Sequence, residues 1–249
     1  VYMNGDAADF VEIKGLQNQQ EIDHSVSVYL DGGAKQIELS NQILPNGAFT
    51  MQFWYKNATT ATGNLISQEN GINASLNGNQ LTFSVGGASV TATIDPSQYN
   101  FYSLVYQSGN DPQLLIFENG NELAVIGDTN LPGDLDFNSN SSIFIGGSNV
   151  KGNIHDLRFW SKTFTPAQAN VSRQTTLTGR ELNLLGYWPL DEGHGKVGID
   201  KAKSRNAIVN LIWAINPKGT AYTFANDAYL SLENVGFVQP SVAEDITLS

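Results

Sequence analysis

Residues 151–168, KGNIHDLRFWSKTFTPAQ, decide the fold class of this chain. The first ten residues alternate between polar and apolar side chains with the period of two that is typical of a half-buried β-strand. Thr165 and Pro166 then provide an N-cap followed by proline at the first helical position. The stretch therefore predicts one strand followed by one short helix, which would lie across a sheet edge or a loop.

His155 stands next to Asp156 in this stretch, so the two residues raise the question of a catalytic pair. In a regular strand, neighbouring side chains point to opposite faces, so His155 would share a face with Leu157, and Asp156 with Arg158. A hydrogen bond from Asp156 to the imidazole would then require a bulge. We expect Asp156 to pair with Arg158 or with nearby backbone, and the stretch to be scaffold.

The same alternation recurs in short runs that Gly, Asn, Asp and Pro separate. Two NGN tripeptides, at 77–79 and 119–121, supply residues that tolerate the positive φ of tight hairpins. The predicted strands are 35–40, 49–56, 63–68, 80–85, 89–94, 101–106, 113–119, 122–127, 142–147 and 153–160. This spacing, with hardly any helical periodicity, predicts an all-β fold built as a two-sheet antiparallel sandwich.

The amino-acid composition argues against several classes of partner and site. Of the 249 residues only 15% are charged, and a surface of Asn, Gly, Ser and Thr is typical of extracellular β-rich proteins. The net charge is −11 and the 13 basic residues are scattered, which argues against nucleic acid and anionic membranes as partners. The absence of Cys excludes disulfides and Cys-based metal sites. No signal peptide and no apolar run long enough to span a bilayer occur.

The expected domain organisation has a sandwich at 28–185, an N-terminal segment at 1–27 and a C-terminal segment at 186–249. Residues 6–15, DAADFVEIKG, resemble 226–234, NDAYLSLEN, at an offset of about 220 residues. Two interpretations stay open. The chain is one period of a tandem array, cut inside a repeat at both ends, or strands of one sandwich share an apolar/polar pattern. The chain starts with Val, so we expect a piece of a longer precursor.

From about Tyr29 to Leu190 the chain resembles the laminin-G-like members of the concanavalin A-like lectin/glucanase superfamily, in particular bacterial laminin-G-like and pentraxin-like modules. The matching segments are YLDGGAKQIELS (29–40), GAFTMQFWYK (47–56), NFYSLVYQSGNDPQLLIFENGNELA (100–124), SIFIGG (142–147), the opening stretch, and LLGYWPLDEGHGKVGID (184–200). The match of the opening stretch is the most specific, since its Gly, Ile, Arg, Trp and helix start all agree in spacing. The resemblance implies a jelly-roll sandwich with a binding or adhesive role.

Glycoside hydrolysis is the enzymatic alternative, because glucanases share the fold that the resemblance implies. Such enzymes need two carboxylates across the scissile bond, about 5–5.5 Å apart in retaining enzymes. The glucanase string E-x-D-x-(x)-E does not occur, since EIDHS (21–25) lacks the second Glu and DLDFNS (134–139) contains none. The sequence also lacks G-x-S-x-G and H-E-x-x-H. We therefore expect no catalytic residues and no enzymatic activity.

Calcium is the cofactor that the resemblance suggests, since in pentraxin-like relatives the ion lies between two loops. Those loops correspond here to Glu69 and Asn70 and to Asn149, although the second loop, GGSNVKG, lacks the acidic residues expected there. The loop at 127–140 is a second candidate because calcium prefers oxygen ligands from such loops. Its acidic residues are Asp128, Asp134 and Asp136. A polar connecting loop without metal is the alternative for this segment.

Glycan sites combine an aromatic platform with amide and carboxylate groups, so that sugar faces stack while hydroxyls form hydrogen bonds. Tyr55, Asn57, Gln68 and Tyr99 are the candidate ligand residues. We expect a non-catalytic binding or adhesion module of a larger secreted or cell-surface protein, bacterial in origin. It would recognise glycan or extracellular protein through rim loops, without nucleic acid or membrane insertion. A structural spacer repeat without a ligand is the alternative.

Overall fold

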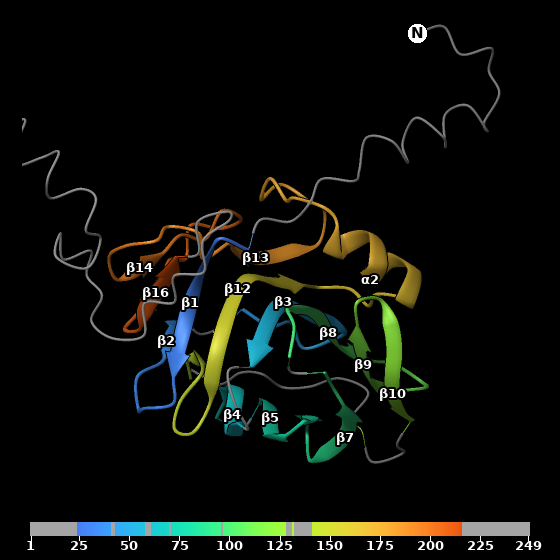
Figure 1. The fold of residues 1–249 in the computed structure, drawn as a ribbon. Helices are drawn as coiled ribbons and strands as arrows, with labels where there is room; N and C mark the ends of the chain where they lie inside the picture. The colour runs from blue at the N-terminus through green and yellow to red at the C-terminus, as the bar shows by residue number, and fades with distance from the viewer. Residues whose placement is uncertain are drawn as a thin grey trace, which may run out of the picture.

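Two antiparallel β-sheets pack face to face, and one helix lies across the outside of one sheet (Figure 1). This arrangement confirms the predicted all-β jelly-roll sandwich, with one short helix in the described part of the chain. The computed structural model describes residues 24–40, 43–57, 61–69, 71–95, 97–127, 131 and 141–215. The two segments that resemble each other in sequence, 6–15 and 226–234, lie outside these residues.

The first sheet, called sheet A here, has the strand order β10-β9-β8-β3-β12-β1-β16, and β13 also pairs with β12. Its strands are β1 (Val26–Asp31), β3 (Phe49–Asn57), β8 (Asn100–Gln107), β9 (Gln113–Glu118), β10 (Asn121–Gly127), β12 (Lys151–Trp160), β13 (Leu184–Trp188) and β16 (Ile212–Ile215). Since β1 and β16 are neighbours, the first and last described strands lie side by side.

The second sheet, sheet B, has the order β14-β15-β2-β11-β4-β5-β6-β7. Its strands are β2 (Ile37–Leu39), β4 (Ala61–Gln68), β5 (Ile72–Gly78), β6 (Gln80–Val85), β7 (Ala88–Thr93), β11 (Ile143–Ile145), β14 (Val197–Gly198) and β15 (Ala207–Val209). The strands between 184 and 215 thus belong to the same two sheets as the strands before them. The division at residue 185 and the tandem array stay predictions.

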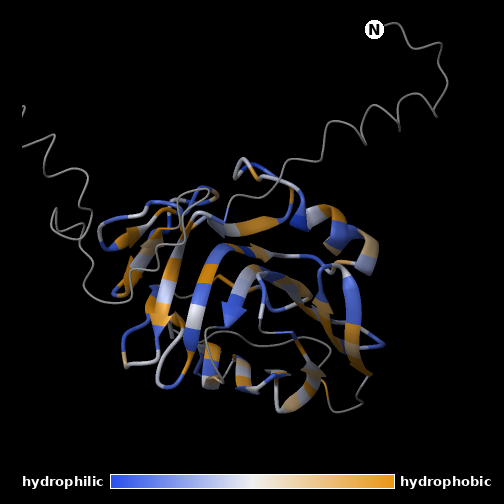
Figure 2. Ribbon diagram, in the orientation of Figure 1, coloured by the Kyte–Doolittle hydropathy of each residue, from blue (hydrophilic) through white to orange (hydrophobic). Residues whose placement is uncertain are grey.

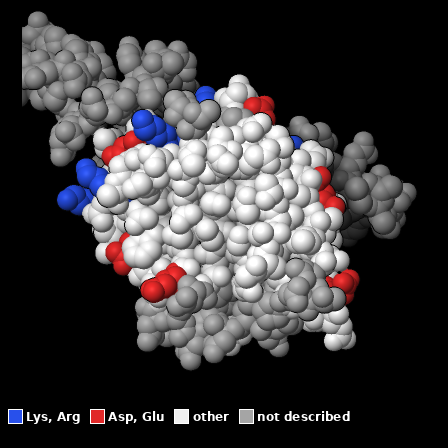
Figure 3. Space-filling view, turned by 90° about the horizontal axis from the view of Figure 1, so that it is seen from below, with Lys and Arg blue, Asp and Glu red and all other residues white. Residues whose placement is uncertain are grey.

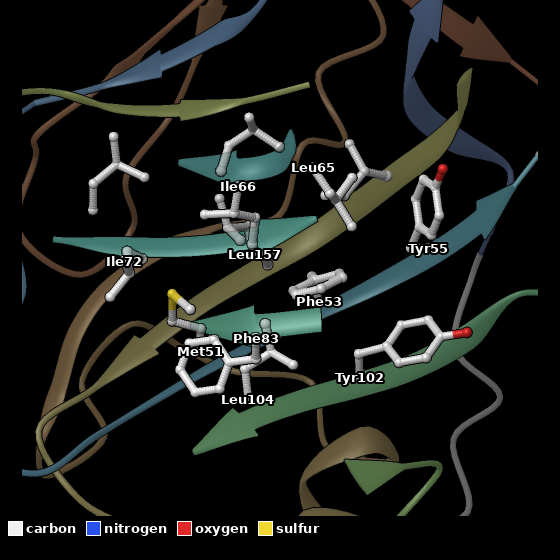
Figure 4. Packing of buried hydrophobic residues seen from close by; sticks show 14 of the residues in the cluster. Met51, Phe53, Tyr55, Leu65, Ile66, Ile72, Phe83, Tyr102, Leu104 and Leu157 are labelled. Atoms are coloured by element: carbon white, nitrogen blue, oxygen red, sulfur yellow. The ribbon is translucent and has the colours of Figure 1, made fainter. Parts of the chain in front are cut away.

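The core lies between the two sheets and follows from the alternation of the strands. In β6 and β7 every second side chain is buried, so apolar residues face the core and polar residues face outward. Figure 2 shows hydrophobic and hydrophilic residues following one another along the strands. Figure 4 shows side chains of β3, β8 and β12 in one cluster with those of β4, β5 and β6. Burial of each large apolar side chain contributes about 1.5–3 kcal/mol to this packing.

The helix α2 (Pro166–Arg173) begins where the sequence predicts. Thr165 Oγ1 accepts from the backbone N–H of Gln168 at 3.3 Å, and Gln168 Oε1 accepts from the backbone N–H of Thr165 at 3.0 Å. This capping box satisfies two N–H groups that the first turn leaves unpaired. Ala169 packs on Val105 and Phe117, so α2 lies over the outer face of β8 and β9 rather than across a sheet edge.

A β-bulge in β12 changes which side chains share a face. The register with β3 shifts between His155 and Arg158, and Asp156 has a φ of 56°. Ile154 and Leu157 both belong to the core cluster, whereas His155 contacts Trp54. The prediction that His155 and Leu157 share a face is therefore wrong, because the bulge inserts one residue and shifts the alternation by one.

Candidate functional site

Three of the four predicted ligand residues lie at one end of the sandwich. Tyr55 and Asn57 are at the end of β3, and Tyr99 directly precedes Asn100, which pairs with Tyr55. Gln68 ends β4, a strand that starts four residues after β3 ends and runs to the opposite end of the sandwich. The structure therefore brings Tyr55, Asn57 and Tyr99 to one end and separates Gln68 from them.

These residues differ in burial. Tyr55 is buried, and its hydroxyl donates to the Lys151 carbonyl at 2.9 Å; burial raises its pKa well above the usual value. Asn57 and Gln68 are also buried. Tyr99 is half-buried, and burial raises its pKa more than its hydrogen bond to Ser27 lowers it. The four residues do not form one exposed surface, and their role as ligands stays a prediction.

Tyr99 belongs to a cluster of rings on the outer face of sheet A, together with His24, Trp54 and His155. His24 stacks on Tyr99 with centroids 4.7 Å apart, and Trp54 stacks on His155 at 6.3 Å. The nitrogens His24 Nδ1 and His155 Nε2 are 2.7 Å apart. His155 is only 3% exposed. The rings pack on one another, and the expectation that the stretch around His155 is scaffold stays a prediction.

Asp156 and Arg158 form the ion pair that the sequence predicts. Arg158 Nε donates to Asp156 Oδ1 at 2.8 Å and Nη2 to Oδ2 at 2.5 Å. Arg158 is fully buried and also donates to the carbonyls of Ser172 and Thr175, at 2.7 and 2.9 Å. Its guanidinium therefore holds the last turn of α2 and the residues after it against sheet A. The carboxylate of Asp156 serves this pair and not an active-site imidazole.

The calcium residues predicted from the pentraxin-like pattern are not brought together. Glu69 directly follows the end of β4, whereas the Asn149 carbonyl accepts from the N–H of Thr62, near the start of that strand. The length of β4, roughly 20 Å, separates them, because β11 runs antiparallel to β4. Glu69 and Asn149 therefore do not fit one shared ion. Asn70, Asp128, Asp134 and Asp136 lie outside the described residues.

Within the described ranges, no group of three or more His, Cys, Asp or Glu side chains is placed to hold a metal ion. Of the helices that the structure describes, none is long and apolar enough to cross a membrane.

The outer face of sheet B carries rows of uncharged polar side chains across β4 to β7. The rows are Ser67, Asn73, Ser84 and Ser89; Ser75, Thr82 and Thr91; and Asn77, Gln80 and Thr93. Thr82 and Thr91 join their hydroxyls at 2.8 Å, and Gln80 Nε2 donates to Thr93 Oγ1 at 2.7 Å. Neighbouring strands lie about 4.8 Å apart, so hydroxyl and amide groups repeat at that spacing.

The strands of sheet B contain one charged residue, Glu38. Figure 3 looks onto this side of the molecule and shows a broad area without charged side chains, with Lys, Arg, Asp and Glu toward its margins. Beside Glu38 lies the half-buried ring of Phe144, which pairs with Glu38 on β2 and with Ser67 on β4. The face thus combines one aromatic ring with hydroxyls and amides.

The charge of the chain is distributed unevenly. The described residues include twelve acidic and eleven basic side chains, so they carry a net charge of about −1 out of −11. The excess of acidic residues lies outside them. The acidic surface that the total charge suggests is therefore not a property of the described sandwich.

Sequence reasoning did not single out this face of sheet B. Its signal is visible in LTFSV and SVTAT, where every polar position holds Ser or Thr and none holds a charged residue. The signal becomes a surface only when the register aligns the polar positions of four strands.

Comparisons with known proteins place this geometry in context. The family model described as concanavalin A-like lectin/glucanases superfamily matches residues 31–170. A candidate carbohydrate binding protein from Bacteroides ovatus is similar in structure, with 17% identity and a TM-score of 0.62 over 79% of this chain and 62% of that one. A heptameric SAP-like pentraxin from Limulus polyphemus has 14% identity and a TM-score of 0.52, over 79% and 98%.

At these identities the likeness shows the fold alone. The chain spans 62% of the length of the Bacteroides protein. The comparison with curated proteins found no match.

Proposed function

The chain belongs to the concanavalin A-like lectin/glucanases superfamily, and from this premise we propose that it is a non-catalytic module that binds a neutral glycan on the outer face of sheet B. The observation that carries the proposal is the single charged residue, Glu38, among the strands of that sheet. A neutral sugar can exchange hydrogen bonds with the rows of hydroxyls and amides without stripping water from charged groups.

Phe144 supports the same surface. Its ring lies half-buried between Glu38 and Ser67, while its neighbours Ile143 and Ile145 are fully buried in the core. An aromatic ring held rigidly in a strand offers a platform for the apolar face of a sugar ring. The ring and the polar rows together supply the two kinds of contact that glycan sites combine.

The distribution of carboxylates supports a binding role rather than hydrolysis. A glycoside hydrolase needs two carboxylates that face each other across the scissile bond. In the strands of sheet B, Glu38 is the single carboxylate, and it accepts a hydrogen bond from Ser142 Oγ at 2.9 Å. A sugar chain on this face therefore contacts one carboxylate, and the strands of sheet B provide no second carboxylate to act with it.

We further propose that the module acts outside the cell, as part of a larger secreted or cell-surface bacterial protein. The low content of charged residues supports this context. Recognition of glycan or protein through rim loops, by Asn57 or Tyr99, stays the alternative binding mode. A spacer without a ligand stays the alternative role.

The test is a glycan array with the full chain, followed by calorimetry with any glycan that binds. Phe144→Ala should weaken binding roughly fivefold, because stacking on one ring contributes about 1 kcal/mol. Thr91→Lys, which places a charge in the middle row, should weaken it further. Val125→Ala is the matched control, since this side chain is 48% exposed on β10 of the other sheet and should leave affinity unchanged.

The alternatives give different results. Binding that survives Phe144→Ala and Thr91→Lys but is lost in Asn57→Ala or Tyr99→Ala would move the site to the rim loops. A chain that melts cooperatively and binds no glycan on the array would support the spacer.

A further inference from the structure

A groove of about 570 Å³ lies on the opposite side of the molecule from the polar rows. It runs between α2, the residues that follow β12, and the segment 174–182. Its lining includes Trp160, Lys162, Phe164, Val171, Leu177 and Leu182. The groove is therefore independent of the surface proposed for glycan.

The walls of the groove expose aliphatic side chains to water. Leu182 is 84% exposed and Val171 is 60% exposed, the two highest values among the large apolar side chains in the described part of the chain. Val171 projects from α2 and Leu182 from the segment before β13. Exposed apolar side chains on two sides of a hollow are typical of a surface that binds a partner.

The floor of the groove consists of aromatic rings with a cation above them. Trp160 and Phe164 are 3% and 7% exposed and meet edge to face at 5.2 Å. Lys162 Nζ lies 4.9 Å from the Trp160 ring centroid and 4.5 Å from that of Phe164. The ion pairs among the described residues do not include Lys162. Its ammonium is thus held over the rings, where an incoming carboxylate can pair with it.

The carboxylate that lines the groove is already engaged. Glu181 accepts hydrogen bonds from the N–H groups of Thr178 and Gly179, at 2.7 and 3.0 Å. Partial burial raises the pKa of Glu181, but these hydrogen bonds lower it more, so the pKa lies below its usual value. Glu181 stabilises the turn at 178–181, and the charge of Lys162 is left for a partner.

From this geometry we propose that the groove docks a segment of a partner polypeptide in which carboxylates alternate with apolar side chains. One apolar side chain of the partner would lie between Val171 and Leu182, and a neighbouring carboxylate would pair with Lys162 on the aromatic floor. The charge of the site and its apolar walls select this chemistry over a basic or a purely polar peptide.

The probe is the synthetic peptide DAADFVEIKG, which has the sequence of residues 6–15 and places three carboxylates among Phe, Val and Ile. Calorimetry uses the full chain with Asp6→Asn, Asp9→Asn and Glu12→Gln, so that its own copy of this sequence does not compete. It should show binding at low salt that weakens as salt is raised. Lys162→Gln should weaken it about tenfold, because the carboxylate loses its charged partner. Leu182→Ser should also weaken it, and this exposed position leaves folding intact.

Two controls separate docking from general electrostatic attraction. Lys151→Gln removes an exposed charge at the far end of β12 and should leave peptide affinity unchanged. The peptide NAANFVQIKG, in which amides replace the carboxylates, should bind at least tenfold more weakly. Failure of DAADFVEIKG to bind, equal binding of the amide peptide, or full binding by Leu182→Ser would overturn the proposal. None of these results bears on glycan binding by sheet B.

Discussion

Arg158 is the residue on which the outer layer of sheet A depends. It is fully buried, paired with Asp156, and donates to the carbonyls of Ser172 in the last turn of α2 and of Thr175 after it. We expect Arg158→Met to lower the free energy of unfolding by about 3–5 kcal/mol, because Asp156 then stays buried without its counterion. Urea denaturation measures this loss.

A double variant separates the ion pair from the hydrogen bonds to the helix. Arg158→Met with Asp156→Asn should cost less than the sum of the two single variants, because no uncompensated charge is left. Arg173→Met is the control, since Arg173 is half-buried and donates to Asn170 within the same helix, so its loss should cost under about 1 kcal/mol. Strict additivity of the two single variants would contradict this account.

Gly120 and Gly78 both lie in two-residue hairpin turns but meet different surroundings. Both have positive φ, 80° and 63°, in the NGN hairpins. A Cβ at Gly120 would lie 2.5 Å from Asn170 Cβ on α2, whereas one at Gly78 would meet nothing within 4 Å. We expect Gly78→Ala to cost about 1 kcal/mol from backbone strain alone. Gly120→Ala should cost distinctly more, because α2 must also move.

Thermal denaturation of the two glycine variants compares them directly. The Gly120→Ala variant should melt at the lower temperature. Equal melting temperatures would mean that α2 moves away from the turn without cost.

At the level of elements, the strands were predictable where apolar and polar residues alternate in strong β-formers. All ten predicted strands are present, and the helix begins at its predicted cap. The strands β1, β5 and β13 are not among the ten predicted runs. The strand β5 was missed because INASLNG alternates in Ala, Asn and Ser, which have low β-propensity. The short β14, β15 and β16 gave no period to detect, since two to four residues cannot show one.

The site residues were less predictable than the strands, for a physical reason. The bulge at Asp156 places a non-glycine residue at positive φ, and only pairing with β3 reveals it. Whether Tyr55 faces the core or a ligand depends on register in the same way, and so does the alignment of the polar rows. The sequence shows which side chains each strand carries, but it does not show which strands pair or in what register.

For the whole molecule, we expect the C-terminal strands to belong to the same folding unit as the central strands. Leu190, Val209 and Trp213 belong to the same core as the central strands, and Trp188 packs edge to face on Phe159. A fragment of residues 28–185 should therefore fail to melt cooperatively, because it lacks β15, β16 and most of β13.

A fragment of residues 24–215 is the control, and circular dichroism during heating should show a single cooperative transition for it. A cooperative transition of 28–185 at the same temperature would instead establish the shorter boundary expected from the sequence.

The pairing of β1 with β16 also determines how the module responds to tension. Val26 lies opposite Ile215, so the chain enters and leaves the described sandwich at one point. A force applied to these two ends breaks the hydrogen bonds between β1 and β16 one pair after another. It does not load all the pairs at once in shear. We expect such a module to unfold under low force. In a longer polypeptide under tension, it would lie beside the line of force. That mechanical behaviour suits a domain that presents a binding face better than one that transmits load.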